Sequence, residues 1–65
     1  MMREKMREYR LREGWSQRQM ALRLGYHENQ YRKVENGLVE PSPRFVVRLA
    51  VLTGKTQEEA KELLM

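Results

Sequence analysis

Cysteine is absent from this chain of 65 residues, and histidine occurs only once. No disulfide can form without cysteine, and one histidine cannot supply the ligands of a structural zinc site. Because a domain of this size has a thin core, its stability has to come from packed helices, with dimerisation as a further contribution. We therefore expect neither a metal ion nor any other cofactor.

Long apolar runs are absent as well. No stretch reaches the roughly 20 apolar residues that cross a membrane. The first ten residues are rich in charge, unlike a signal peptide. We expect a soluble, cytoplasmic protein that does not bind membranes. With one histidine, no cysteine and no glycine-rich phosphate loop, the chain offers little for a catalytic site, so we do not expect an enzyme.

Acidic residues are the minority among the charged ones: 9 Asp and Glu stand against 13 Lys and Arg, a formal net charge of +4. A basic balance favours a polyanionic partner such as nucleic acid. The charge is unevenly distributed along the chain. Residues 56–65 contain one lysine and three glutamates, a net charge of −2, so residues 1–55 carry +6. The C-terminal segment is therefore unsuited to contact with phosphate.

Apolar residues recur at helical spacing in five segments, which are separated by glycine or proline, and no strand pattern or repeat is present. The pattern predicts an all-α fold, a compact bundle of five short helices in a single domain of residues 1–65. The expected helices lie at about 2–13, 16–24, 28–36, 42–53 and 56–64. The expected inward residues are Met2, Met6, Tyr9, Met20, Leu24, Tyr31, Val34, Phe45, Leu49, Leu52, Ala60, Leu63 and Leu64.

Polar residues at the expected helix starts match the chemistry of N-caps. Ser16 with Gln19, and Thr56 with Glu59, fit capping boxes, in which two side chains satisfy backbone N–H groups that have no helical partner. Ser42 is a good N-cap for the fourth helix. These residues predict where three of the five helices begin.

The connection between the second and third segments is very short. A helix of about eight residues is followed by Gly25, one apolar residue and a new helix, which is the helix-turn-helix pattern, here over about residues 16–36. Gly25 suits the left-handed conformation at a helix end. Tyr26 and Tyr31 are spaced as a hydrophobic staple around an N-cap at His27.

The outward face of the third helix is amidic and cationic. Its members, with the two residues at the start of the helix, are His27, Glu28, Asn29, Arg32, Lys33 and Asn36. Asparagine can pair with adenine, and arginine or lysine with guanine, in the major groove of DNA. A polar face alone more often means only a solvated surface, but the glycine turn and the basic balance favour DNA.

The run from Ser16 to Gly37 resembles the helix-turn-helix of phage repressors and Cro, the XRE family. The resemblance is carried by Ser16-Gln17, Met20-Ala21, Gly25 and Glu35-Asn36-Gly37, and it extends over about residues 6–64. It implies a lambda-repressor-like domain whose third helix (about 28–36) enters the major groove. It also implies a sequence-specific regulator of transcription, which we expect to be a repressor. Such a protein would act on the nucleoid of a prokaryotic cell or a phage-infected host.

The resemblance also assigns roles by position. The expected base-reading residues, with Arg32 added from its chemistry, are His27, Glu28, Asn29, Arg32 and Lys33. The expected phosphate contacts are Gln17, Asn36 and Arg44, to which we add Arg18. Glu28 has two equally good interpretations: its carboxylate can accept from cytosine N4, or it can complement the positive end of the helix dipole.

Two charges, Arg10 and Glu35, fall on otherwise apolar faces, where a lone charge would be costly. Because they are opposite, we predict a structural ion pair that ties the first helix to the third; the family resemblance implies the same pair. The alternative, an active-site charge pair, has no cleft chemistry to support it.

Several apolar residues point away from the expected core: Leu11, Leu22, Val47 and Val51. For the two valines on the fourth helix we consider two hypotheses. Either the fifth helix covers them, or the C-terminal region (Val47, Val51, Leu63, Leu64) forms the interface of a homodimer. Thr53 and Lys55 stand where the family usually has apolar residues, so the end of the fourth helix is expected to be shifted or more exposed.

Two other functions compete with DNA binding. The same fold can serve as a protein-interaction module, antitoxin-like or regulator-binding, with DNA binding secondary. The basic segment 1–13 could lie on an anionic membrane, but three glutamates dilute its charge and it lacks Trp and Phe. The outward Asn29, Arg32 and Lys33 favour double-stranded DNA as the partner.

Overall fold

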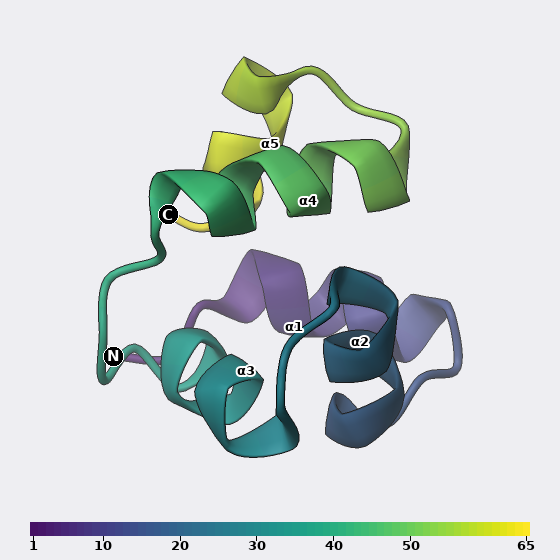
Figure 1. Cartoon of the computed structure of the whole chain (residues 1–65), viewed down its shortest axis with the longest axis vertical. Coiled ribbons are helices and arrows are strands. Elements are labelled where there is room, and N and C mark those ends of the chain that lie inside the picture. Colours follow the sequence, from purple (N-terminus) through teal and green to yellow (C-terminus); the bar gives the residue numbers. More distant parts are fainter.

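The computed structural model describes all residues 1–65 and consists of five helices without strands. The helices are α1 (Glu4–Arg12), α2 (Gln17–Leu24), α3 (Glu28–Glu35), α4 (Pro43–Thr53) and α5 (Gln57–Leu63), as Figure 1 shows. The predicted all-α fold of five short helices is confirmed.

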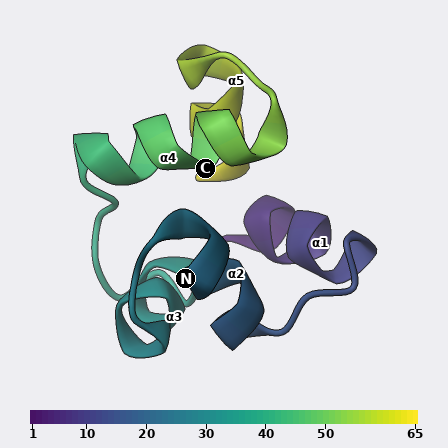
Figure 2. The ribbon, with the colours of Figure 1, turned by 45° about the vertical axis from the view of Figure 1, so that its right-hand side comes forward.

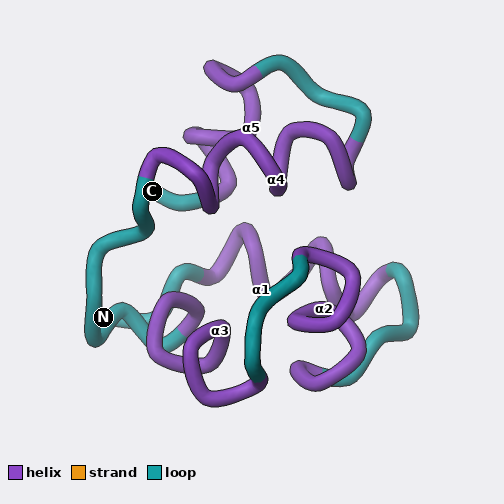
Figure 3. Tube along the Cα trace, in the orientation of Figure 1, coloured by secondary structure: helices purple, strands orange, loops and turns teal.

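The helices form two groups. α1, α2 and α3 lie together, and α4 and α5 lie side by side across them, as the two views in Figures 1 and 2 show. α4 contacts both α2 and α5, and α5 also reaches α1. The trace in Figure 3 contrasts the short connection between α2 and α3 with the longer one that carries the chain from α3 to α4.

The core lies between the two groups of helices. It comprises the buried residues Met6, Met20, Ala21, Leu24, Tyr31, Val34, Phe45, Val46, Leu49, Ala50 and Ala60. Tyr31 and Phe45 are the largest of them, and their rings stack with centroids 6.4 Å apart. Most of the residues predicted to face inward are therefore buried, while Tyr9, Leu52, Leu63 and Leu64 are partly buried at the edge of the core.

The predicted N-caps are present. Ser16 and Gln19 form a capping box at α2, and Thr56 and Glu59 form one at α5. The Ser42 hydroxyl accepts from the N–H of Phe45 at the start of α4. Each cap joins residues three positions apart, so it depends on local sequence alone.

The start of α1 differs from the prediction. The helix begins at Glu4 rather than at Met2, and Met2 is exposed instead of facing the core. The reason is a tertiary hydrogen bond: the N–H of Arg3 donates to the carbonyl oxygen of Glu35 at 2.7 Å. This bond holds Arg3 at the end of α3, and the two methionines before it lie outside the helix.

The hypothesis that the fifth helix covers the outward valines of α4 is wrong. Val47 is 43% exposed and Val51 is 78% exposed, although α5 packs along α4. α5 instead buries Ala60 in the core and leaves this face of α4 open. The end of α4 is not shifted, because Gly54 caps it and the Thr53 hydroxyl donates to the carbonyl of Leu49 at 2.8 Å. It is exposed at Lys55, the other alternative that we predicted, while Thr53 is half-buried.

Candidate nucleic-acid interface

The turn between α2 and α3 depends on the left-handed backbone of Gly25, whose φ is +78°. The N–H of Tyr26 donates to the carbonyl of Ala21 at 2.9 Å, and that of Gly25 donates to the carbonyl of Leu22 at 3.1 Å. This Schellman arrangement ends α2 and reverses the chain within two residues. α3 then starts at once, with the N–H of His27 donating to the side-chain oxygen of Gln30 at 3.0 Å.

Arg48 of α4 braces this turn, a role that we did not predict. Its Nη1 donates to the carbonyl of Leu24, the last residue of α2, at 3.0 Å. Its guanidinium also lies 5.9 Å from the ring centroid of Tyr26. A Cβ at Gly25 would collide with Nη1 of Arg48. The helical spacing indicated that Arg48 faces inward, because it lies on the same side of α4 as Phe45 and Leu52.

The outward face of α3 carries exposed polar side chains. Asn29, Arg32 and Lys33 are exposed, as is His27 at the N-cap, whereas Glu28 is half-buried. The opposite face of α3 buries Tyr31, Val34 and Glu35. The structure therefore places Asn29, Arg32 and Lys33 on the exposed face of α3, while His27 and Glu28 lie at its N-terminal end.

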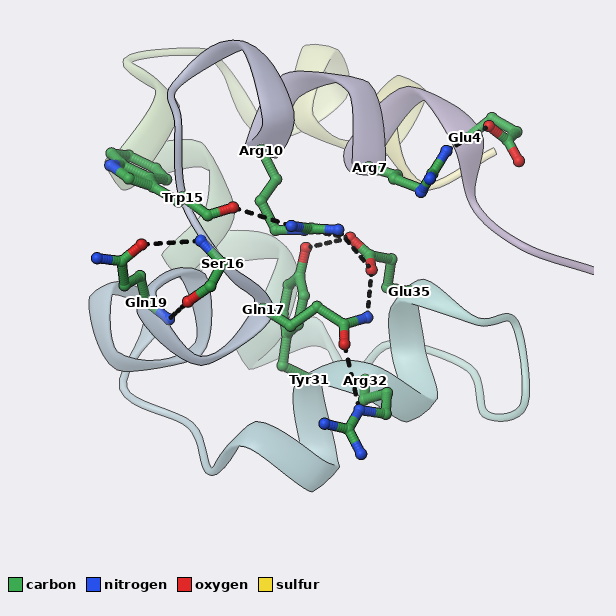
Figure 4. A network of polar contacts seen from close by, with 10 residues as sticks. All are labelled: Glu4, Arg7, Arg10, Trp15, Ser16, Gln17, Gln19, Tyr31, Arg32 and Glu35. Carbon is green, nitrogen blue, oxygen red and sulfur yellow. Dashed lines mark hydrogen bonds and ion pairs between the residues drawn. The ribbon is translucent and has the colours of Figure 1, made fainter.

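The ion pair between Arg10 and Glu35 is present and buried. Nε of Arg10 donates to Oε1 of Glu35 at 2.8 Å, and Nη2 donates to Oε2 at 3.3 Å, so the pair is bidentate. Two more side chains donate to the same carboxylate: the Tyr31 hydroxyl at 2.9 Å and Nε2 of Gln17 at 2.6 Å. Figure 4 shows these groups converging on Glu35 from α1, α2 and α3.

This network shifts the protonation equilibria of its members. Burial opposes the charged form of Glu35, but the hydrogen bonds from Arg10, Gln17 and Tyr31 outweigh it and hold the pKa of Glu35 below its ordinary value. Burial, followed by the neighbouring Glu35 charge, raises the pKa of the Tyr31 phenol well above its ordinary value. At neutral pH the carboxylate is therefore ionised and the phenol donates to it.

Gln17, a predicted phosphate contact, is the first residue of α2 and is held by the protein itself. Its amide nitrogen donates to Glu35, and its amide oxygen accepts from Nε of Arg32 at 3.2 Å (Figure 4). Gln17 lies at the helix N-terminus as predicted, whereas its two partners were not predicted. A contact between Gln17 and phosphate remains a prediction.

The other predicted phosphate contacts lie on three different elements. Arg18 is exposed in the first turn of α2, Arg44 is exposed in the first turn of α4, and Asn36 is the half-buried C-cap of α3. The structure does not bring them together into one cluster. Such a spread suits contacts with a long duplex backbone rather than with one small anion.

Arg3 is a second buried arginine that the sequence analysis missed. Its guanidinium donates to the carbonyls of Val34, Val39 and Leu64 at 2.6, 3.2 and 3.0 Å. It also pairs with Glu40 at 3.4 Å. Arg3 thereby ties the end of α3 and the following loop to the end of α5. The burial of Arg3 could have been predicted from its spacing, because it lies seven residues before Arg10 and so on the same helical face.

The structure shows no group of three or more His, Cys, Asp or Glu side chains that could hold a metal ion. None of its helices has the length and apolar character to cross a membrane.

A family model described as a helix-turn-helix domain matches residues 2–63. The chain therefore belongs to the helix-turn-helix domain family. In this class the second helix of the motif is the one that reads DNA, and here that helix is α3. Membership supports DNA binding. No curated protein and no solved structure shows a significant match to the chain.

We predict that Gly25→Ala lowers the free energy of unfolding by more than Gly54→Ala does. Both glycines have positive φ, so each alanine carries a backbone cost of about 1–2 kcal/mol. Only at Gly25 does the new methyl also displace the end of the Arg48 side chain and with it the hydrogen bond to Leu24, whereas nothing lies within 4 Å at Gly54. Urea denaturation of both variants measures the difference, and equal losses would contradict a brace at Arg48.

We predict that the buried Glu35 carboxylate makes the free energy of unfolding fall at acidic pH. Because the pKa of Glu35 is lowered in the folded protein, its contribution is complete above the unfolded value of about 4.5 and is lost as the pH falls through the folded value. Removing one partner of a buried pair costs about 3–5 kcal/mol. Glu35→Gln should therefore be much less stable at pH 7 and should lose less stability on acidification. Urea titrations from pH 7 to pH 3 check this, and parallel curves for both proteins would refute it.

Proposed function

We propose that the protein is a sequence-specific transcriptional regulator that inserts α3 into the major groove of duplex DNA and represses by occlusion. The observation that carries this proposal is the exposed face of α3, where Asn29, Arg32 and Lys33 follow a braced glycine turn. Amide and guanidinium groups are the side chains that read adenine and guanine in that groove.

The proposed docking places two kinds of contact on the duplex. His27, Glu28, Asn29, Arg32 and Lys33 face the base edges. The N-termini of α2 and α4 and the C-terminus of α3 face the backbone, with Gln17, Arg18, Arg44 and Asn36 as phosphate contacts. The backbone contacts set the register of α3, and the base contacts set the sequence preference. We propose no catalytic activity, and we place the protein in the cytoplasm, on the nucleoid.

The first experiment measures binding of a labelled random-sequence duplex by fluorescence anisotropy at several salt concentrations. Binding should weaken steeply with salt, because phosphate contacts release condensed counterions. Selection of the preferred site from random duplexes then follows. Absence of binding at low salt would contradict the proposal and favour the protein-interaction module instead.

On the selected site, Asn29→Ala should lose roughly 1–3 kcal/mol of binding free energy and relax the preference at one base pair. Gln57→Ala on α5 is the matched control, since α5 lies outside the proposed interface. Competition with singly substituted duplexes measures both effects. If Asn29→Ala weakened binding to all sequences equally, Asn29 would not read a base.

We further propose that two copies associate through the open face of α4 and read two half-sites about one helical turn apart. Val47 and Val51 remain exposed there, whereas Leu63 and Leu64 are partly buried against the chain's own core. The dimer therefore depends on the two valines rather than on all four predicted residues.

Sedimentation at high micromolar concentration should show a dimer for the native chain and a monomer for Val51→Glu. A buried carboxylate without a partner would oppose the interface. The matched control is Leu11→Glu, which changes an exposed leucine of α1 and should leave the dimer intact. A monomeric native chain under these conditions would rule the dimer out.

A further inference from the structure

Arg32 is exposed, yet two neighbours hold its guanidinium in place. Nη2 donates to Oε2 of Glu28, one turn earlier on α3, at 2.6 Å. Nε donates to the amide oxygen of Gln17 on α2 at 3.2 Å. Two contacts from two different helices restrict a side chain that otherwise has many rotamers.

Gln17 connects Arg32 to the buried part of the network. A carboxylate can only accept and a guanidinium can only donate, so the amide nitrogen has to face Glu35 and the amide oxygen has to face Arg32. Both contacts are present, and Figure 4 shows Gln17 between its two charged neighbours. Arg32 is therefore anchored, through Gln17, to the carboxylate that α1, α2 and α3 share.

The two contacts leave part of the guanidinium unused. A guanidinium has five N–H donors, and Gln17 and Glu28 take one each from Nε and Nη2. Both N–H groups of Nη1 and one N–H of Nη2 remain, so each of the two terminal nitrogens can still offer one donor, as the bidentate pairing with O6 and N7 of guanine requires. Helical side chains lean toward the helix N-terminus, which is the end of α3 that reaches the bases in this class.

The pairing with Glu28 distinguishes a base contact from a phosphate contact. The Glu28–Arg32 pair carries no net charge, and the carboxylate itself repels phosphate, so the pair is a poor counterion for the backbone. The edge of a guanine is neutral, so it is recognised by hydrogen-bond donors in the right positions rather than by net charge. These properties favour a base over a phosphate as the partner of Arg32.

We propose that Arg32 reads a guanine in the DNA site and that Glu28 is the positioning residue that aims its guanidinium. This inference rests on the proposed function and makes it more specific. It also decides between the two interpretations of Glu28, because a carboxylate occupied by Arg32 in this geometry supports its neighbour instead of accepting from cytosine.

The test compares the sites selected by the native chain, Arg32→Lys and Glu28→Gln. The native site should contain one G·C pair that Arg32→Lys no longer requires, with a loss of roughly tenfold or more in discrimination at that pair. Lysine keeps the charge but lacks the fork. Arg12→Lys, at the exposed end of α1, is the matched control and should leave the site unchanged.

Glu28→Gln separates positioning from a merely structural role. It should lower discrimination at the same G·C pair while strengthening binding to unrelated duplexes, because a negative charge near the backbone is removed. A residue that only stabilised α3 would change the melting temperature without changing this ratio. Thermal melting of each variant shows that the proteins compared are folded.

The outcomes distinguish this inference from the function on which it rests. If the native chain selects a site but Arg32→Lys weakens binding to all duplexes equally, Arg32 contacts phosphate and the inference alone is overturned. The inference alone is also overturned if Arg32→Lys still requires the guanine in the selected site. If the native chain binds no DNA or selects no sequence, the proposed function itself fails.

Discussion

One buried carboxylate holds α1, α2 and α3 together. Glu35 accepts hydrogen bonds from Arg10 of α1, Gln17 of α2 and Tyr31 of α3, so three helices share a single group. A buried charge is tolerable only when its hydrogen-bonding capacity is filled, and here each donor comes from a different helix. The position of α2 relative to α3 therefore follows from the need to satisfy Glu35.

The second group of helices supports the same geometry from the other side. Arg48 of α4 donates to the last carbonyl of α2 and packs over the turn at Gly25. The angle between α2 and α3 is therefore supported by Arg48 at the turn and by the hydrogen bonds to Glu35. Arg3 performs a similar task at the far end of α3 by bonding to carbonyls of α3, the following loop and the end of α5. Arginine suits both places because its guanidinium offers several donors to backbone carbonyls at helix ends and in the loop after α3.

Much of the fold could be predicted because its determinants are local. Capping boxes at Ser16 and Thr56 and the glycine ends at Gly25 and Gly54 act within a few residues, so they appear in the sequence as short patterns. The pairing of Arg10 with Glu35 could also be predicted, since two opposite charges on apolar faces have few other partners. The start of α1 was predicted wrongly, because the hydrogen bond from Arg3 to Glu35 joins residues far apart in the chain.

The sequence by itself determined the five helices, most of their ends apart from the start of α1, most of the core and the polar character of the outward face of α3. Periodicity and capping are properties of neighbouring residues, and they suffice for these features. Only the tertiary structure decided that Val47 and Val51 stay open, that Arg3 and Arg48 anchor the motif, and that Gln17 and Glu28 both accept hydrogen bonds from Arg32. These features depend on which donor meets which acceptor across helices, and that choice is made when the helices pack.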